Sequence, residues 1–436
     1  MSHRVLCPRT PRPLPTHSLS TGSIHSLWTN YNPVITQGHD SAPVTSQGVV
    51  GRVSRSLIAT LREMRDAVGM ERSDLDSLLR RLSAAEGSDL HLKAGSPPRM
   101  RINGELTRVT DVPVIKPEDM VKVAKEVMQE RTWDHFEKTN EADFAYSIPN
   151  LGRFRVNAYR QRSTIGMVFR LVRSHARSFG ELNLPEAVRR LADEQRGLIL
   201  VTGPTGCGKT TTLAAMVDHI NRTRECHIVT IEDPIEVLHQ DELSAVSQRE
   251  VGFDTSSFLV ALRSALREDP DVILVGEMRD VETVETALSA AETGHLVFAT
   301  LHTIDCVETI NRVVDFFPSA QQRQARLSLA GALKGTLCQR LIPTADGSGR
   351  VPALEIMIIN GRIQQCIIEP GQGGDITAII REGEYYGMQT FDQALVSLLE
   401  QGTIDLRAAT QAASNPHDLR VALQKRGLIG SAAGRN

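Results

Sequence analysis

The sequence has few aromatic residues, few cysteines and no long apolar run. Aromatic residues account for 4% of its 436 positions, apolar residues for 41% and charged residues for 23%. This balance is that of an ordinary globular protein and excludes a chain that is mostly disordered. The longest apolar runs, such as 198–201, 272–275 and 296–301, fall far short of the about 20 residues that a membrane-spanning helix requires. Since a single core rarely grows past about 300 residues, we expect two or three domains and no membrane span.

Neither sign of charge predominates in the sequence. It contains 49 Lys and Arg against 52 Asp and Glu, for a formal net charge of −3. Proteins that coat DNA or RNA usually carry a clear basic excess. We therefore expect no nucleic-acid partner, and a DNA-translocating machine is a weak alternative.

The cysteines are too scattered to form a metal-binding framework of the usual spacing. No two of them make a Cys-x-x-Cys pair, which excludes zinc ribbons, and we expect no zinc. The beginning of the chain lacks the apolar stretch of a secretory signal. Reduced thiols without such a signal are typical of the cytosol, so we expect the protein to work inside the cell. The six cysteines are Cys7, Cys207, Cys226, Cys306, Cys338 and Cys366.

Composition and periodicity divide the chain into segments. Residues 1–72 are rich in Pro, Ser and Thr and show no apolar period, so we expect a disordered tail. Met70 directly precedes the first helical pattern, which leaves open whether residues 1–69 belong to the native protein. The expected segments are, in order, the tail at 1–72, a small α+β domain at 73–172, a linker at 173–185, an α/β domain at 186–428 and a flexible end at 429–436.

The first of these domains shows both helical and strand patterns. Leucines at helical spacing predict a helix at its start, and Asn103-Gly104 is a favoured hairpin turn. Alternating apolar residues predict half-buried antiparallel strands further on. The expected elements are a helix through 75–82, a strand at 89–92, a hairpin within 100–106, one helix around 117–138, and strands at 153–162 and 164–171.

The last two strands also carry several arginines in quick succession. One interpretation is a solvated strand face. The other is that one or two of these side chains reach a nucleotide phosphate across a domain or subunit boundary. The residues are Arg153, Arg155, Arg160, Arg162 and Arg170.

In the second domain, a glycine-rich turn follows a short buried strand at 197–202. It matches the P-loop pattern, in which backbone N–H groups and a helix N-terminus surround phosphates. Lys209 supplies a point charge to the β and γ phosphates, and the Thr210 hydroxyl binds Mg²⁺. The sequence therefore predicts ATP and Mg²⁺. The expected nucleotide-binding residues are Gly203, Pro204, Thr205, Gly206, Cys207, Gly208, Lys209, Thr210 and Thr211.

Two acidic sites follow the ends of later buried strands. Glu232 comes directly after the strand at 228–231, and Glu277 follows the strand at 272–275. Ligands of open parallel sheets lie beyond the carboxyl ends of the strands, so both carboxylates are expected beside the P-loop. Phosphoryl transfer needs a metal ion and a carboxylate that orients water. We favour Glu277 for the metal and Glu232 for water positioning, although the pattern does not separate the two roles.

Two histidines flank a third buried strand. His295 precedes the run at 296–301 and His302 follows it. A lone histidine in such a place is more often structural than catalytic. Two of them beside the strand that follows the acidic site suit sensing of the γ-phosphate, which is the role we predict.

Longer stretches resemble the secretion-type ATPase superfamily, which drives type II secretion and type IV pili. Residues 266–280 look like its signature sequence, residues 230–236 resemble its Asp box, and residues 294–303 resemble its His box. The resemblance runs from about residue 73 to residue 428.

Other motifs are similar to one branch of that superfamily, the pilus retraction ATPases of twitching motility. They lie at 88–92, 103–106, 387–392 and 412–416. This resemblance implies an α/β protein in which a PAS-like domain precedes a RecA-like ATPase domain with a C-terminal helical part. It also implies a homohexameric ring, cytoplasmic and peripheral at the inner face of the membrane, with a membrane platform protein of the pilus as partner.

The resemblance further implies that an arginine completes the site from a neighbouring subunit. Arg263, Arg267 and Arg279 are candidates beside the arginines of the first domain. Residues 359–365 depart from the Ala-Ile-Arg-Asn-Leu segment that retraction members often carry. Two alternatives therefore stay open: a pilus-assembly or type II secretion motor, and a nucleotide-gated regulatory subunit with little hydrolysis.

Overall fold

The computed structural model describes residues 70–102, 104–172, 175–371 and 374–429. Most of the expected disordered tail lies outside the described residues, and so do the first two residues of the expected linker and nearly all of the flexible end. Within the described ranges, no helix combines the length and the apolar character that crossing a membrane would require.

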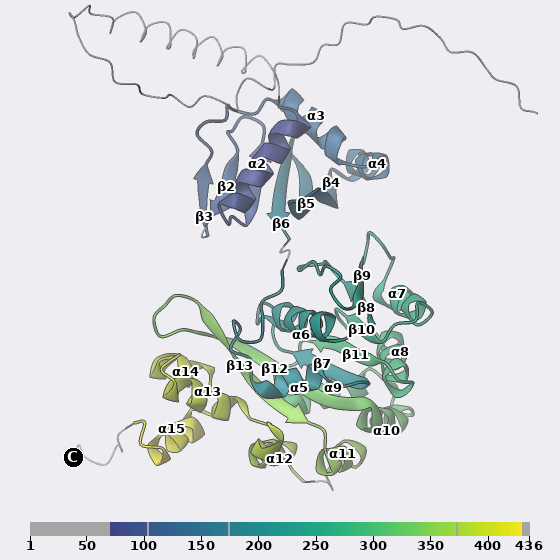
Figure 1. Ribbon diagram of the computed structural model, residues 1–436, viewed down its shortest axis with the longest axis vertical. Coiled ribbons are helices and arrows are strands. Elements are labelled where there is room, and N and C mark those ends of the chain that lie inside the picture. Colours follow the sequence, from purple (N-terminus) through teal and green to yellow (C-terminus); the bar gives the residue numbers. More distant parts are fainter. Residues whose placement is uncertain (1–69, 103, 173–174, 372–373, 430–436) are drawn as a thin grey trace, which may run out of the picture. The chain divides into compact units, whose positions relative to one another are not determined.

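Residues 89–171 form an antiparallel sheet of six strands (Figure 1). The strand order is β3-β2-β1-β6-β5-β4. Phe154, Val156 and Ala158 of β5 are fully buried while their neighbours are not, as the alternation predicts for a half-buried strand. The strands are β1 (Asp89–Lys93), β2 (Arg99–Ile102), β3 (Glu105–Arg108), β4 (Glu141–Ile148), β5 (Gly152–Gln161) and β6 (Thr164–Leu171).

One face of this sheet carries three helices, α2 (Arg72–Ala84), α3 (Pro117–Val127) and α4 (Glu130–Thr139). The predicted hairpin and strands of this sheet are confirmed, whereas the single helix expected around 117–138 is wrong. Extended backbone at Met128 and Gln129 separates α3 from α4, and this break lets Phe136 enter the same core as Val127. Strand β4 was not predicted, although its buried Ala142, Phe144, Tyr146 and Ile148 alternate with exposed or half-buried residues.

A second sheet has seven strands in the order β13-β12-β7-β11-β10-β8-β9. Neighbouring strands from β12 to β9 are parallel, and β13 is an antiparallel edge strand. All residues of β7, β10 and β11 are buried. The strands are β7 (Gly197–Thr202), β8 (His227–Glu232), β9 (Ala245–Glu250), β10 (Val272–Val275), β11 (Leu296–Leu301), β12 (Leu333–Pro343) and β13 (Arg350–Ile358).

Helices cover both faces of the second sheet, and each face has its own core (Figure 1). Leu198 and Leu200 of β7 belong to the core of one face, whereas Ile199 and Val201 belong to the core of the other. The second core is shared with α5 (Glu186–Ala192) and α6 (Lys209–Thr223), and the first with helices that follow in the chain. Those helices are α7 (Phe258–Ala265), α8 (Val281–Glu292), α9 (Cys306–Asp315), α10 (Gln322–Ala332), α11 (Gly361–Ile368) and α12 (Ile376–Glu382).

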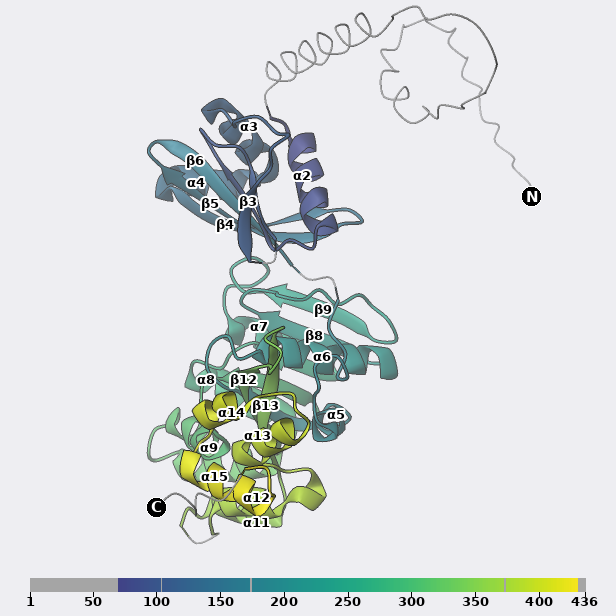
Figure 2. The ribbon, with the colours of Figure 1, turned by 90° about the vertical axis from the view of Figure 1, so that its left-hand side faces the viewer.

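The C-terminal part is helical and packs on the β12–β13 ribbon (Figure 2). Ile342 of β12 and Val351 of β13 share a small core with Leu395, Leu398 and Leu419. The helices are α13 (Phe391–Glu400), α14 (Leu406–Ala412) and α15 (Pro416–Lys425), after a 3-10 turn at Glu384–Tyr386. A mixed α/β protein with a parallel sheet and a C-terminal helical part, as the sequence predicts, is confirmed.

Candidate active site

The predicted P-loop connects the carboxyl end of β7 to α6. The helix begins at Lys209. Gly203 and Gly208 have φ angles of 139° and 93°, which residues with a side chain rarely adopt. A Cβ atom at Gly203 would also lie 2.5 Å from the backbone oxygen of Gln339. The glycines of the motif are therefore required both by the backbone conformation and by the close approach of β12.

Gln339 of β12 supports this loop from behind. Its side chain is 2% exposed; Nε2 donates to the carbonyl of Cys207 at 2.6 Å, and Oε1 accepts from the Thr212 hydroxyl at 2.7 Å. Both hydrogen bonds are buried, so losing them would leave polar groups without partners. The role of this residue could not be predicted, because nothing near Gln339 in the chain indicates that β12 lies beside β7.

The ammonium group of Lys209 lies over the loop. Its Nζ donates to the carbonyl of Gly203 at 2.7 Å and lies 3.4 Å from Nδ1 of His302. The Nε2 atom of His302 in turn lies 3.2 Å from Oε1 of Glu277. A neutral imidazole with its proton on Nε2 satisfies both contacts, since Nδ1 then accepts from Lys209. His302 thus connects the P-loop lysine to the acidic residue after β10.

Glu232 and Glu277 line one cavity of about 450 Å³ together with Lys209 and Thr210. Strands β8 and β10 are parallel neighbours in register, so their carboxyl ends meet at the same edge of the sheet. The volume is in the range of ordinary ligand pockets. The structure thus brings together the P-loop and both predicted carboxylates.

The two carboxylates differ in their surroundings. Glu232 is 9% exposed; its Oε1 accepts from the Thr230 hydroxyl at 2.7 Å and from Nε2 of Gln248 at 3.1 Å. Burial raises the pKa of the Glu232 carboxyl, and neighbouring acidic residues add to this effect, while the two hydrogen bonds oppose it. A carboxyl with a raised pKa is a better proton acceptor than an ordinary one when ionised.

Glu277 is paired with Arg279 and His302. Its Oε2 atom accepts from the Arg279 guanidinium at 2.7 Å, and His302 approaches its other oxygen. Partial burial acts to raise the pKa of Glu277, but the hydrogen bond and charge of Arg279, with a smaller effect of His302, outweigh it and hold the pKa below its ordinary value. Glu277 is therefore ionised at neutral pH.

His295 is not among the residues that line this cavity in the described part of the chain, and its role in sensing the phosphate stays a prediction. His295 precedes β11 and His302 follows it. The six residues of β11 span about 20 Å at about 3.3 Å per residue. The His295 Nδ1 atom lies 3.0 Å from the carbonyl of Ala290, at the end of α8.

Several residues around the cavity were not predicted from the sequence. Gln248 lies on β9, a strand with no clear apolar alternation in the sequence, and Arg350 begins β13. His239, Arg350 and Thr300 line the cavity, and the Thr300 hydroxyl donates to the carbonyl of Gly276. The motif of the His box includes Thr300, but no local signal indicated Arg350 or His239.

The predicted arginines are distributed differently. Arg279 is the one that contacts a predicted site carboxylate, while Arg263 and Arg267 are absent from the residues that line the cavity in the described part of the chain. In the first sheet, Arg160 pairs with Glu137 and Arg170 pairs with Asp89.

Comparisons with known proteins agree with this geometry. A family model described as type II/IV secretion system protein matches residues 65–370. The type IV pilus retraction ATPase PilT of Pseudomonas aeruginosa is 46% identical over 346 residues, or 79% of this chain and 99% of that protein. A twitching motility protein of Neisseria gonorrhoeae is 44% identical over 322 residues, or 74% of this chain and 86% of that protein.

A solved structure is similar as well. The crystal structure of the pilus retraction motor PilT with bound ADP is 46% identical, with a TM-score of 0.71 over 79% of this chain and 98% of that one. These similarities confirm the resemblance to the pilus retraction branch that the sequence motifs indicated. Since the family model covers well over half of the sequence, the chain belongs to the type II/IV secretion system protein family.

Proposed function

We propose that this chain is an ATPase that uses Mg²⁺ and drives type IV pilus retraction and twitching motility. One observation carries the chemical part of the proposal: Lys209, Glu232 and Glu277 line the same cavity at the carboxyl edge of the parallel sheet. The similarity to PilT over nearly the whole length of that protein supports retraction as the output.

In this proposal the P-loop binds the triphosphate of ATP. Backbone N–H groups at the start of α6 point toward bound anions, and the helix adds partial positive charge. Thr205, Gly206, Gly208 and Thr211 also line the cavity. Lys209 exchanges its contact with the Gly203 carbonyl for the β and γ phosphates, where its charge is worth more.

The residues present suit Mg²⁺, which prefers oxygen ligands. The Thr210 hydroxyl and the ionised Glu277 carboxylate line the cavity together, and we propose that they hold the ion. When bound, Mg²⁺ neutralises charge that develops on the phosphate oxygens. The pairing of Glu277 with Arg279 and His302 keeps this carboxylate ionised and oriented.

We propose Glu232 as the residue that positions the attacking water. Its carboxyl has few competing cations and a raised pKa, so it can accept a proton from water more readily than Glu277 can. Thr230 and Gln248 fix the orientation of the carboxylate. Water held in this way needs little further activation, because the transition state of phosphoryl transfer is loose.

His302 suits a sensor of the γ-phosphate. It contacts both Lys209 and Glu277, so movement of Lys209 onto a phosphate removes one of its two partners. The contact to Glu277 is then free to change. A difference in the contacts made with ATP and with ADP is what allows a nucleotide to shift a protein between two conformations.

We further propose a homohexameric ring in which an arginine from a neighbouring subunit completes the site. The described residues are proposed to divide into a PAS-like domain at 73–172 and a RecA-like domain at 186–428, with a linker between them. The proposed location is the cytoplasmic face of the inner membrane, through a pilus platform protein rather than through lipid. No nucleic-acid partner is proposed.

A genetic experiment tests whether the protein drives pilus retraction. The gene is deleted in its own cell, and the cell is complemented with the wild type, with Lys209→Ala or with Lys138→Ala, an exposed lysine on α4. We expect abundant but immobile pili after deletion, with motility restored by the wild type and by Lys138→Ala only. Absence of pili after deletion would instead identify an assembly motor.

A biochemical experiment tests the enzyme. ATP turnover of the purified full chain is compared with that of Lys209→Ala and Glu277→Ala. The proposal expects both variants to lose nearly all turnover. Equal residual rates in all three proteins would favour a regulatory subunit that barely hydrolyses ATP.

A further inference from the structure

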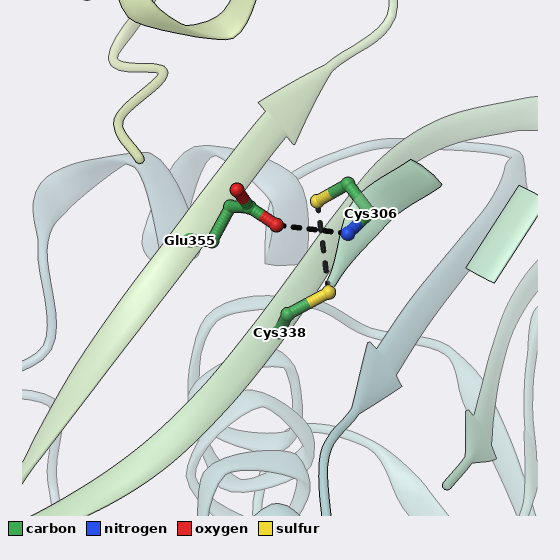
Figure 3. A group of neighbouring side chains, drawn as sticks. All are labelled: Cys306, Cys338 and Glu355. Atoms are coloured by element: carbon green, nitrogen blue, oxygen red, sulfur yellow. Dashed lines mark hydrogen bonds between the residues drawn. The ribbon is translucent and has the colours of Figure 1, made fainter. Parts of the chain in front are cut away.

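Two thiols and a carboxylate meet in the interior, away from the cavity that contains Lys209. They belong to Cys306, Cys338 and Glu355, all of them buried, and their potential ligand atoms lie within 4.8 Å of one another (Figure 3). The two cysteines are 32 positions apart and their sulfurs are 3.6 Å apart. The expectation of no zinc rested on sequence spacing, which does not reveal this pair, because the fold alone brings the two thiols together.

The sheet determines where two of the three residues lie. Cys338 of β12 is directly opposite Glu355 of β13 in the antiparallel pair, and it is also opposite Thr202 of β7. Cys306 reaches this row from the first position of α9, where its backbone N–H donates to Oε2 of Glu355 at 2.8 Å. The three residues are therefore held by regular structure, which is what a metal site with defined geometry requires.

We propose that Cys306, Cys338 and Glu355 bind one thiophilic divalent cation, of which Zn²⁺ is the natural example, with a water molecule as fourth ligand. Two sulfurs bound tetrahedrally to zinc at about 2.3 Å lie about 3.8 Å apart, close to the separation observed between Cys306 and Cys338. Thiolates with one carboxylate suit zinc rather than Mg²⁺.

The charges around the cluster also favour a cation. Cys306 and Cys338 are fully buried, and Glu355 is 6% exposed. Three groups that can each become negative thus share a desolvated space, and a divalent cation would compensate two of the charges.

A cavity gives access to the cluster. Glu355 lines a cavity of about 610 Å³ among the C-terminal helices, which is bounded also by Arg381, Thr390 and Lys425. Water from this space can reach the carboxylate while both sulfurs stay buried. An entry path and an open fourth position are features expected of a real metal site.

The proposed ion would stabilise the wall behind the P-loop. The Thr202 hydroxyl donates to the sulfur of Cys338 at 3.0 Å, and Thr202 is the residue before Gly203. A bound cation would connect β12, β13 and α9 beside this contact. The inference does not depend on the proposed function, because it concerns a different set of residues.

Cobalt substitution tests the site. The full chain is purified in chelator and reductant, and Co²⁺ is added in the absence of nucleotide. We expect one Co²⁺ per chain to produce the sulfur-to-cobalt charge-transfer absorption of two thiolates, and Zn²⁺ to abolish it. Co²⁺ bound by the oxygen ligands Thr210 and Glu277 would give no such absorption, so the two sites are distinguishable.

Cysteine variants show which thiols produce the charge-transfer absorption. Cys338→Ser is expected to remove about half of the absorption, the double variant Cys306→Ser/Cys338→Ser all of it, and the control Cys226→Ser none. Zn²⁺ should raise the thermal midpoint of the wild type and of the control but not that of the double variant. Should the double variant fail to fold, the presence or absence of charge-transfer absorption in the wild type still decides whether thiolates bind the cation.

Three results would overturn the inference. They are a wild-type spectrum without charge-transfer absorption, an absorption that persists in the double variant, and a denatured, unreduced chain whose mass shows that Cys306 and Cys338 are joined in a disulfide. The last result would mean that the two thiols form a bond with each other instead of binding an ion.

Discussion

The two sheets of this protein use buried and charged residues in different ways. In the antiparallel sheet, strands such as β5 are buried on one face only, and buried acidic residues serve structure: Asp89 pairs with Arg170 at 2.9 Å. In the parallel sheet, β7, β10 and β11 are buried on both faces, and Glu232 and Glu277 lie at strand ends around one cavity. Parallel strands place their carboxyl ends at one edge, so a parallel sheet can gather catalytic groups from distant parts of the chain.

The largest expected effect is at the carboxyl edge of the parallel sheet. Glu232→Gln keeps the size of the side chain but removes the proton acceptor, and we expect kcat to fall by about a thousandfold with nucleotide affinity nearly unchanged. Steady-state ATPase assays and binding of a fluorescent ATP analogue measure the two quantities. Glu242→Gln, an exposed glutamate nearby in the chain, is the control. Near-normal kcat in Glu232→Gln would transfer the water-positioning role to another residue.

The next effect is on the stability of the antiparallel sheet. Phe169 of β6 is fully buried, so Phe169→Ala should lower the free energy of unfolding by about 3–5 kcal/mol. Trp133 of α4 packs on the same core, and its fluorescence reports unfolding in a Trp28→Phe background. Leu106→Ala, on exposed β3, should have little effect. If both variants lost equal stability, the one-sided burial of this sheet would be contradicted.

A smaller effect is expected behind the P-loop. Gln339→Ala leaves the Cys207 carbonyl and the Thr212 hydroxyl without their buried partners. This should lower the free energy of unfolding by about 1–3 kcal/mol. Because the unsupported loop must be ordered by the ligand, we expect ADP affinity to fall by about tenfold. Calorimetric titration measures it, with the exposed Gln401→Ala as control. Unchanged affinity would show that β7 and α6 hold the loop without help from β12.

The smallest expected effect is a change in the pH dependence of kcat/KM. Arg279 and His302 hold the pKa of Glu277 below its ordinary value although burial acts in the opposite direction. The ionised form is therefore present above this low pKa and is lost as the pH falls through it. Arg279→Ala removes the main lowering contribution, so the acid limb of kcat/KM should move to higher pH. Arg407→Ala on exposed α14 is the control; an acid limb shifted to lower pH by Arg279→Ala would contradict this assignment.

Local patterns were sufficient for much of the fold. The strands at 197–202 and 272–275 were expected with the bounds that the structure has, because continuous β-branched and aliphatic runs between turns are strong signals. The helix break at Met128 and the strand β9 were not predicted. Both depend on contacts with distant residues, so no local pattern indicates them.

The residues of the active site also divide into those with a local sequence signal and those without one. The P-loop, Glu232 and Glu277 could be predicted because each lies next to a strand end, where the chain itself carries the signal. His302 lines the cavity whereas His295 does not, because proximity to a strand does not say which end of it lies at the cavity. Gln339 and Gln248 could not be predicted, since they reach the site from strands that are neighbours in the sheet and not in the chain.

The sequence by itself determined the strand-turn-helix of the P-loop and the order of the acidic residues, because these depend on backbone preferences within a few residues. Only the tertiary structure decided that Glu232 is buried among acids and hydroxyls while Glu277 is paired with Arg279 and His302, and that Cys306 meets Cys338. The reason is physical: burial, the pKa of a group and the partners of a thiol depend on all neighbours in space, and most of those neighbours are remote in the chain.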